Sequence, residues 1–184
     1  MGEIIWNRSD DMRITTKRLT IRELTAEDWR NMQRIALDFG KSEYRIYDIP
    51  LPTEDTEIKA LTDRFVQSGL FFAVLLEETM IGYICFHEDS GNYDLGYCFL
   101  SEYQGKGYAY EACVAAMAYM TETADVKAFT AGTALDNLPS CKLLRKLGFD
   151  LRKTETLSFH QDENGKDITF LGGVFVKEVN HYDR

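Results

Sequence analysis

Residues 103–111 read YQGKGYAYE, in which two glycines flank a lysine. It follows an apolar, strand-like run at 93–100 and precedes a long apolar segment with the spacing of a helix. Gly105 and Gly107 permit backbone angles that other residues resist, and they let a ligand approach the main chain closely. The start of the following helix adds unpaired amide groups and partial positive charge. Together these features predict an anion site, most naturally for phosphate.

Two familiar phosphate-binding motifs do not fit this stretch. A P-loop needs G-x-x-x-x-G-K-[ST], whereas Lys106 lies between the glycines and no Ser or Thr follows it. The dinucleotide fingerprint G-x-G-x-x-G fails because Tyr110 occupies the position of its third glycine. Taken alone, the pattern also fits an ordinary glycine-rich loop between a strand and a helix. The surrounding sequence has to decide.

Length and composition indicate one globular domain. A chain of 184 residues is long enough for one compact domain and short for two. Its 45% hydrophobic and 28% charged residues are typical of a soluble protein. No apolar run approaches the roughly 18 residues of a membrane span, and no signal-peptide pattern is evident at the start. We therefore expect a cytoplasmic protein without a membrane partner.

The cysteines agree with that location. Cys85, Cys98, Cys113 and Cys141 fall in expected strands or helices, without a CxxC pair or the spacing of metal ligands. They indicate reduced thiols in the core and no metal site.

The net charge is −9, from 21 basic and 30 acidic residues. Proteins that bind nucleic acid normally present a basic face, so this balance argues against a nucleic-acid partner. It is compatible with a cationic acceptor such as a polyamine, an aminoglycoside or a basic peptide. A negative net charge is also common among soluble proteins, so it is evidence about solubility before it is evidence about a ligand.

Hydrophobic periodicity predicts strands and helices in alternation. The first dozen residues show no clear period and suggest an arm or a short added strand. Strands are expected at 13–24, 71–76, 80–86, 93–100, 126–133, 149–159 and 167–176. Helices are expected after the caps Thr25, Thr53 and Asn137, and from Tyr108 to about Thr123. The strand, helix and strand around the glycine loop form a βαβ unit, whose strands are parallel.

This order of elements, together with three local motifs, resembles the GNAT acyltransferases. Residues 104–109 (QGKGYA) match the family's pyrophosphate loop, Q/R-x-x-G-x-G/A. Residues 137–140 (NLPS) open the next helix, and 143–149 (LLRKLGF) look like the family's N-x-x-S-x-x-L-x-K-L-G-F ending. The resemblance extends from about residue 13 to residue 176. It implies one α/β (α+β) domain: a mixed central sheet of about six to seven strands with a splayed parallel pair, flanked by about four helices.

Within the family, the chain is most similar to the ribosomal-protein N-terminal alanine acetyltransferases. Their opening T-x-R-L-x-I-R is matched by TKRLTIR at 16–22. That group also contains enzymes that act on small amines, so the acceptor is either a protein N-terminus or a small-molecule amine. The resemblance implies acetyl-CoA as co-substrate and direct attack of a primary amine in a ternary complex.

The resemblance also implies where acetyl-CoA would bind. Backbone groups at 98–100 would pair with the pantetheine arm like an added strand, while loop amides braced by Gln104 would hold the pyrophosphate. Asn137 would bond to the pantetheine or the acetyl region, with a plain helix cap as the alternative. The expected cofactor-binding residues are Cys98, Phe99, Leu100, Gln104, Gly105, Lys106, Gly107, Tyr108, Ala109, Tyr110, Asn137 and Ser140.

Acetyl transfer also needs an oxyanion donor and an acid for the leaving thiolate. A backbone N–H near Phe99 or Leu100 is the expected donor. Many family members protonate the thiolate with a tyrosine seven residues after the asparagine, but Leu144 stands there in this chain. The resembling subgroup carries serine at the position of Ser140, which makes Ser140 the expected acid. A first-turn helix serine without a catalytic role is the alternative.

The general base is the least constrained element of the expected site. Glu88, Asp89 and Asp94 flank the strands where an acceptor would arrive, and Glu88 and Asp94 are the candidate bases. Each carboxylate is equally compatible with a solvated turn residue that has no catalytic role. The neighbouring His87 is better interpreted as an ordinary strand residue than as a general base. A thioester is already activated, so alignment can supply most of the rate with a weak base.

Other readings stay open at this point. A GNAT-like module that binds acyl-CoA without catalysis would keep the loop, and a nucleotide-dependent enzyme is disfavoured by the absent Ser or Thr. In the family the segment between the first two helices, here 44–48, borders the acceptor site. The aromatic residues that can line an acceptor pocket or a homodimer interface are Tyr44, Tyr47, Phe159 and Phe170.

Overall fold

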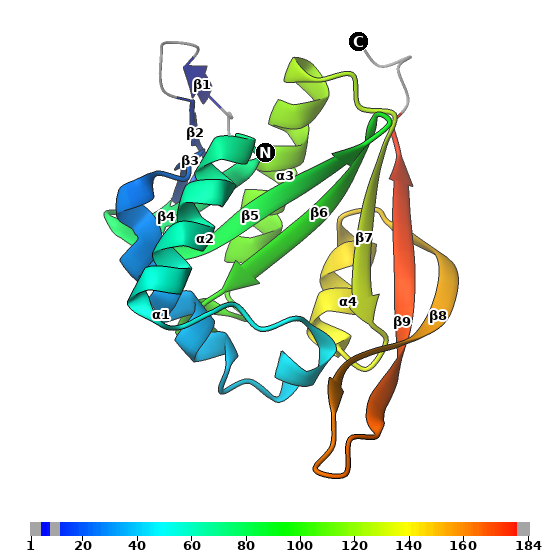
Figure 1. Cartoon of the computed structure of the whole chain (residues 1–184). Coiled ribbons are helices and arrows are strands. Elements are labelled where there is room, and N and C mark those ends of the chain that lie inside the picture. Colours follow the sequence, from blue (N-terminus) through cyan, green and yellow to red (C-terminus); the bar gives the residue numbers. More distant parts are fainter. Residues whose placement is uncertain (1–4, 8–11, 180–184) are drawn as a thin grey trace.

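The computed structural model describes residues 5–7 and 12–179. Within these ranges, nine strands form one mixed sheet and four α-helices cover its two faces (Figure 1). The sheet order is β1-β2-β3-β4-β5-β6-β7-β9-β8. The strands are β1 (Ile5–Asn7), β2 (Arg13–Thr15), β3 (Leu19–Glu23), β4 (Phe71–Leu76), β5 (Thr79–Asp89), β6 (Asn92–Phe99), β7 (Ala128–Ala134), β8 (Asp150–Gln161) and β9 (Asp167–Glu178). The α-helices are α1 (Trp29–Phe39), α2 (Asp55–Ser68), α3 (Tyr108–Thr123) and α4 (Leu138–Lys146), with short 3₁₀ turns η1 (Ala26–Asp28), η2 (Glu43–Tyr47) and η3 (Ser101–Tyr103).

The expected order of elements is confirmed, but the sheet has more strands than expected. The segment 13–24 is two antiparallel strands, β2 and β3, and not one. They turn at Thr16, whose main-chain N–H donates to Leu19 O at 2.9 Å and whose hydroxyl oxygen accepts from the Leu19 N–H at 3.0 Å. The chain before residue 13 contributes β1 to the sheet edge, and residues 1–4 and 8–11 of that arm lie outside the described residues. Helix α2 is capped by Glu54, one residue after the expected Thr53.

The predicted capping signal before α1 is present and is part of a buried ion pair. Asp28 accepts from the Thr25 N–H at 2.9 Å and from both terminal nitrogens of Arg22, at 2.6 and 2.8 Å. Burial alone would raise the pKa of Asp28, but the bonds from Arg22 and Thr25 lower it overall. The pair fixes the start of the helical layer to β3.

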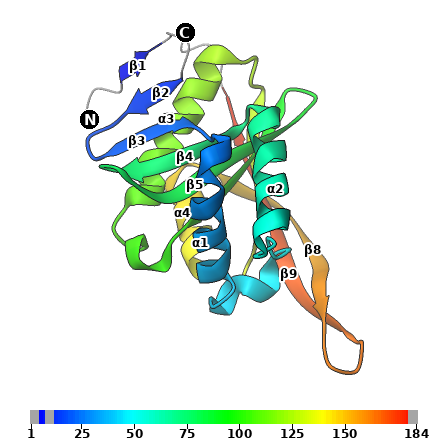
Figure 2. The same cartoon turned by 60° about the vertical axis from the view of Figure 1, so that its left-hand side comes forward.

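Helices α1 and α2 lie on one face of the sheet and α3 and α4 on the other (Figure 2). The α3 side holds the larger core, because α3 is rich in small apolar residues such as Ala112, Ala115 and Ala116 that let it pack closely on the sheet. On the α1–α2 side, Phe65 of α2 stacks on Phe71 of β4 with ring centroids 3.8 Å apart. Among the described residues, no helix is both long and apolar enough to cross a bilayer.

The sheet opens between its two parallel strands. β6 and β7 pair only at Asn92↔Ala128, Tyr93↔Phe129 and Asp94↔Thr130. Beyond these pairs the strands diverge (Figure 1), while β7 stays paired with β9 along its whole length. The expected splayed pair is therefore confirmed, and the rest of β6 has no strand on its β7 side. The β8–β9 hairpin extends away from the body of the molecule (Figure 2), with its turn at the predicted Asn164-Gly165.

Candidate active site

The glycine loop adopts the conformation that its sequence predicts. Gly105 has φ of 72° and Gly107 has φ of 81°, both in the left-handed region that favours glycine. Gly107 is the N-cap of α3, so the chain enters the helix directly from that residue. The free amides of the first helical turn and the exposed Lys106 therefore lie next to each other. This geometry suits an anion.

Gln104 ties the loop to the end of β6. Its side-chain amide donates to Phe99 O at 2.8 Å, the bracing contact that the sequence suggested. The Leu100 N–H is occupied by Ile81 O at 3.0 Å. Because hydrogen-bond directions alternate along an antiparallel strand, the main-chain groups of Tyr97 and Phe99 face the opening, whereas those of Cys98 and Leu100 face β5. Of the two expected oxyanion donors, Phe99 is thus the one that remains available.

Arg18 holds the loop from the other side, a role that the sequence did not reveal. Its Nη1 donates to Lys106 O at 3.0 Å, and its guanidinium carbon lies 4.4 Å from the centroid of the Tyr108 ring. Its Nε and main-chain N–H donate to the two oxygens of Glu111, which also accepts from the Thr16 hydroxyl at 2.7 Å. Burial alone would raise the pKa of Glu111, but these bonds lower it and keep the carboxylate charged.

Ser140 is hydrogen-bonded to a tyrosine of β6. Its hydroxyl oxygen lies 2.8 Å from the hydroxyl oxygen of Tyr97, and its N–H donates to Asn137 Oδ1 at 3.2 Å. Asn137 is therefore a helix cap, whatever else it binds. Burial raises the pKa of Tyr97 well above its ordinary value, despite the opposing effect of Ser140. The phenol is protonated and lies beside the opening, although Leu144 replaces the family tyrosine.

The candidate bases lie on different faces of the sheet. Asp94 is exposed at the last parallel pair, where it accepts from the Thr130 hydroxyl at 2.8 Å. In the register of β5 and β6, Asp94 lies opposite His87, whose ring is edge-on to the ring of Phe71 on the α1–α2 face. Glu88 alternates to the opposite face, and its carboxylate accepts from the Gly91 N–H at 2.8 Å in the β5–β6 turn. Asp94 therefore lies at the edge of the opening, whereas the Glu88 carboxylate stabilises the β5–β6 turn.

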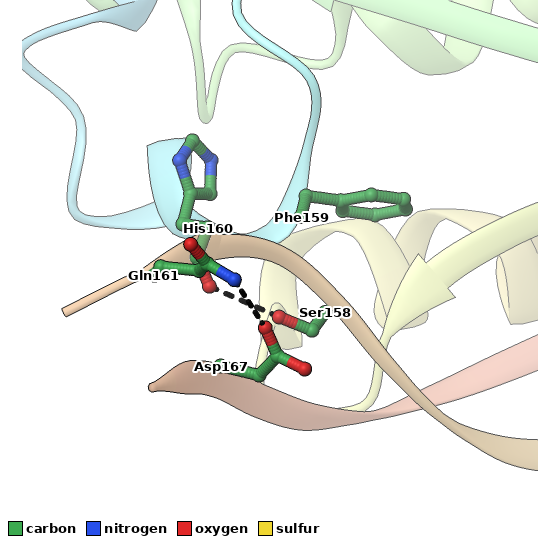
Figure 3. Close-up of a pocket in the computed structure, with 5 residues that line it drawn as sticks. All are labelled: Ser158, Phe159, His160, Gln161 and Asp167. Carbon is green, nitrogen blue, oxygen red and sulfur yellow. Dashed lines mark hydrogen bonds between the residues drawn. The ribbon is translucent and has the colours of Figure 1, made fainter. Parts of the chain in front are cut away.

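A second group of polar side chains lies where η2 meets the β8–β9 hairpin. His160 Nε2 is 2.9 Å from Asp48 O, and the ring of Tyr47 contacts that of Phe170 at 5.2 Å between centroids. Figure 3 shows His160 turned toward the segment that follows η2, away from Asp167. An open depression beside the hairpin is lined by Ser158, Phe159, His160, Gln161 and Asp167.

The thiols do not form an ionised or metal-binding group. Burial raises the pKa of Cys98 and that of Cys85 to about 12, so both are protonated. Cys98 is half-buried and the other three cysteines are buried, all as free thiols. Within the described part of the chain, no three His, Cys, Asp or Glu side chains come together as metal ligands.

A mixed sheet that opens between two parallel strands, with a glycine-rich loop and a helix N-terminus at one end of the opening, is the architecture of a GNAT acyltransferase. The sequence matches the family model described as "Acetyltransferase (GNAT) domain" over residues 18–150. The chain therefore belongs to the GNAT acetyltransferase family.

The relatives agree with this assignment. YnaD, an uncharacterized N-acetyltransferase of Bacillus subtilis (strain 168), is 31% identical over 140 residues, which span 74% of this chain and 82% of YnaD. The ribosomal L7/L12 alpha-N-protein acetyltransferase RimL, in complex with coenzyme A, has a TM-score of 0.74 at 18% identity, over 96% of this chain and 98% of RimL. The microcin C7 self-immunity acetyltransferase MccE, in complex with acetyl-CoA and AMP, has a TM-score of 0.73 at 13% identity, over 89% and 94% of the two chains. The two solved structures show a shared fold.

Proposed function

We propose that this protein transfers the acetyl group of acetyl-CoA to a primary amine, by direct attack within a ternary complex. The observation that carries the proposal is the opening between β6 and β7, which leads to the glycine loop at the start of α3. An extended arm can pair with the free edge of β6 while its phosphates meet the loop amides. RimL with coenzyme A and MccE with acetyl-CoA, two structures with this fold, support the choice of co-substrate.

The residues along the opening suit each part of that ligand. Tyr97 presents its main-chain groups to the arm, and the Phe99 N–H stays available for the thioester oxygen because Gln104 binds Phe99 O. Lys106 and the amides of the first α3 turn provide positive charge for the pyrophosphate. Gln104 and Arg18 hold the loop in place from either side.

The same residues supply the steps of the reaction. The Phe99 N–H donates to the thioester oxygen as negative charge develops there. The amine nitrogen forms a bond to the carbonyl carbon, and the carbon–sulfur bond then breaks. Ser140 Oγ–H gives its proton to the departing sulfur and regains one from solvent, while the Tyr97 hydroxyl donates a hydrogen bond to Ser140 Oγ and so orients it. Asp94 and solvent are the available acceptors for the proton that the amine loses.

The test is the release of free thiol from acetyl-CoA in the presence of spermidine, aminoglycosides, amino acids or peptides with different N-termini. Acetyl-CoA binding is measured separately by calorimetry. Binding together with thiol release that depends on an amine would support the proposal. Tight binding without release across the panel would move the function to a non-catalytic acyl-CoA-binding module, and absence of binding would overturn the assignment of the loop.

A further inference from the structure

We propose that the hydrogen bond from Thr130 of β7 to Asp94 of β6 is a latch that fixes the point at which the sheet opens. We call this pair of residues the β6–β7 latch. Its two members act as positioning residues, because they set the geometry of the opening that the co-substrate enters. The latch itself is a property of the free protein, whereas its effect on ligand binding rests on the proposed function.

The latch lies at the end of the parallel pairing. Asp94↔Thr130 is the last register pair of β6 and β7, and beyond it the strands diverge (Figure 1). The Thr130 hydroxyl donates to Asp94 Oδ1 at 2.8 Å. In residues 5–7 and 12–179, this is the one hydrogen bond that joins a side chain of β6 to a side chain of β7. The bond therefore lies where the two strands part.

Both members of the latch point to the face of the sheet that α1 and α2 cover. Side chains alternate along a strand. Phe129 and Ala131, the neighbours of Thr130, lie in the core on the α3 side, so Thr130 points to the other face. Asp94 shares the face of Cys98, which packs against the α1–α2 core. A hydroxyl and a carboxylate on facing positions of the same side can meet across the strands.

The next position on that face is a glycine in both strands. Gly96 follows Asp94 by two residues, and Gly132 follows Thr130 by two. A Cβ atom added at Gly132 would meet nothing within 4 Å, so open space lies over this part of β7. A Cβ atom added at Gly96 would lie 2.7 Å from Cys85 Sγ, a contact that only glycine avoids. The α1–α2 face thus changes from a bridged pair to a cleared opening within one step of the alternation.

Apolar packing holds the strands on the opposite face, but it does not mark the same point. The Phe86 ring contacts both strands there, with its centroid 6.5 Å from that of Tyr93 and 5.8 Å from that of Phe129. Leu95 and Ala131 continue this core past the last register pair, and both are buried. A core that extends beneath the opening resists separation of the strands without defining where it begins. The latch supplies that definition.

The expected strength of the latch is modest but sufficient. A hydrogen bond to a carboxylate is stronger than one between neutral groups, whereas exposure to water lowers its net contribution. We expect its loss to change the local opening equilibrium roughly fivefold. That change is small compared with the stability of a whole domain. It is large for a connection of three register pairs, which opens locally at low cost.

Loss of the latch should make the co-substrate bind more weakly. β7 leads into α4, so separation of β7 from β6 would carry Asn137 and Ser140 away from the opening. The ligand would then have to close the opening as it binds, which lowers its affinity. The bond between Ser140 and Tyr97 remains as a link between the two sides on the α3–α4 face and limits the movement.

The first test uses the free protein. Thr130→Val replaces the hydroxyl by a methyl group, and it should speed amide hydrogen exchange at residues 92–95 and 128–131 about fivefold. Thr130→Ser keeps a hydroxyl and should restore slow exchange. The matched control is Thr133→Val, the same change on β7 at a position of the opposite face. Unchanged exchange in Thr130→Val, or equal acceleration in Thr133→Val, would overturn the inference.

A second comparison isolates the bond itself. Asp94→Ala removes the acceptor, so it should speed exchange in the same two segments. The double variant Asp94→Ala/Thr130→Val should exchange no faster than the faster of the single variants, because both changes remove one bond. Multiplying effects of the two changes would show that the residues act independently, and the latch would then be refuted.

Binding of coenzyme A separates this inference from the proposed function. Coenzyme A is the probe because its binding needs no acceptor amine. Thr130→Val should raise the Kd for coenzyme A about threefold by calorimetry, while Thr133→Val should leave it unchanged. Faster exchange with an unchanged Kd would contradict the positioning role. Failure of the unaltered protein to bind coenzyme A would instead overturn the proposed function, and the exchange measurements would still decide whether the latch exists.

Discussion

Arg18 and Glu111 are 93 positions apart in the sequence, yet Arg18 Nε donates to Glu111 Oε2 at 2.7 Å and the Arg18 N–H donates to Glu111 Oε1 at 2.9 Å. The pair joins the turn between β2 and β3 to the first turn of α3. Because Arg18 also donates to Lys106 O, the geometry of the glycine loop depends on the N-terminal hairpin.

Removal of Arg18 should therefore weaken acetyl-CoA binding more than it weakens folding. Arg18→Ala is expected to raise the Kd for acetyl-CoA about tenfold by calorimetry, because the loop loses a hydrogen bond and a nearby positive charge. Arg18→Lys should recover little, since lysine lacks the planar fork. Lys17→Ala removes an exposed charge from the same turn and is the control. An equal loss in both alanine variants would exclude a specific role for Arg18.

Gly107→Asp should abolish acetyl-CoA binding, because a carboxylate would face the pyrophosphate and the left-handed backbone would be strained. Gly107→Ala separates these two causes, since it adds the strain without the charge and should cost about 1 kcal/mol of stability. Calorimetry with both variants gives the comparison. Unchanged affinity in Gly107→Asp would disprove the phosphate role of the loop.

Tyr97 and Ser140 should act as a unit. Tyr97→Phe and Ser140→Ala are each expected to lower kcat about tenfold with little change in the Kd for acetyl-CoA, and the double variant should be no slower than Ser140→Ala. Tyr93→Phe removes a hydroxyl from the same strand and should be neutral. If Tyr97→Phe keeps its full kcat, then its hydroxyl only packs against the helix.

Asp28 should make stability depend on pH. Its folded pKa is lowered, so its contribution is present above the unfolded pKa and is lost as the pH falls through the folded pKa, below about pH 4. Asp28→Asn should destabilise the protein at pH 7 by about 3 kcal/mol, because Arg22 loses its buried partner. Urea unfolding at pH 7 and pH 3 measures both effects. Glu163→Gln, at an exposed position in the β8–β9 turn, should behave like the unaltered protein at both pH values.

Local signals were sufficient for most elements of the fold. The Thr25 and Asp28 cap, the glycine entry into α3 and the Asn164-Gly165 turn are all encoded within a few neighbouring residues. The alternation at 13–24 was misread as one strand because a tight hairpin preserves an apolar alternation on both sides of its turn. The turn residues 16–18 carry no glycine or proline to mark it.

The candidate site was predicted only where its residues are contiguous. The loop at 104–110 and the cap at Asn137 were found from the sequence, whereas Tyr97 and Arg18 were not. Their partners, Ser140 and Glu111, are brought to them by strand register and helix packing, which no local pattern records.

The short pairing between β6 and β7 has a consequence for local unfolding of the sheet. In the part of the chain that the structure describes, three register pairs are the whole strand-to-strand connection between β1–β6 and the unit formed by β7, β9 and β8. That C-terminal unit should therefore open by local unfolding at a lower free energy than the rest of the sheet. In the proposed complex, a ligand arm paired with the edge of β6 would act as a removable additional strand. We expect acetyl-CoA to slow amide hydrogen exchange in β7 and β9. Binding of the ligand and the stability of the sheet against local opening are then thermodynamically linked.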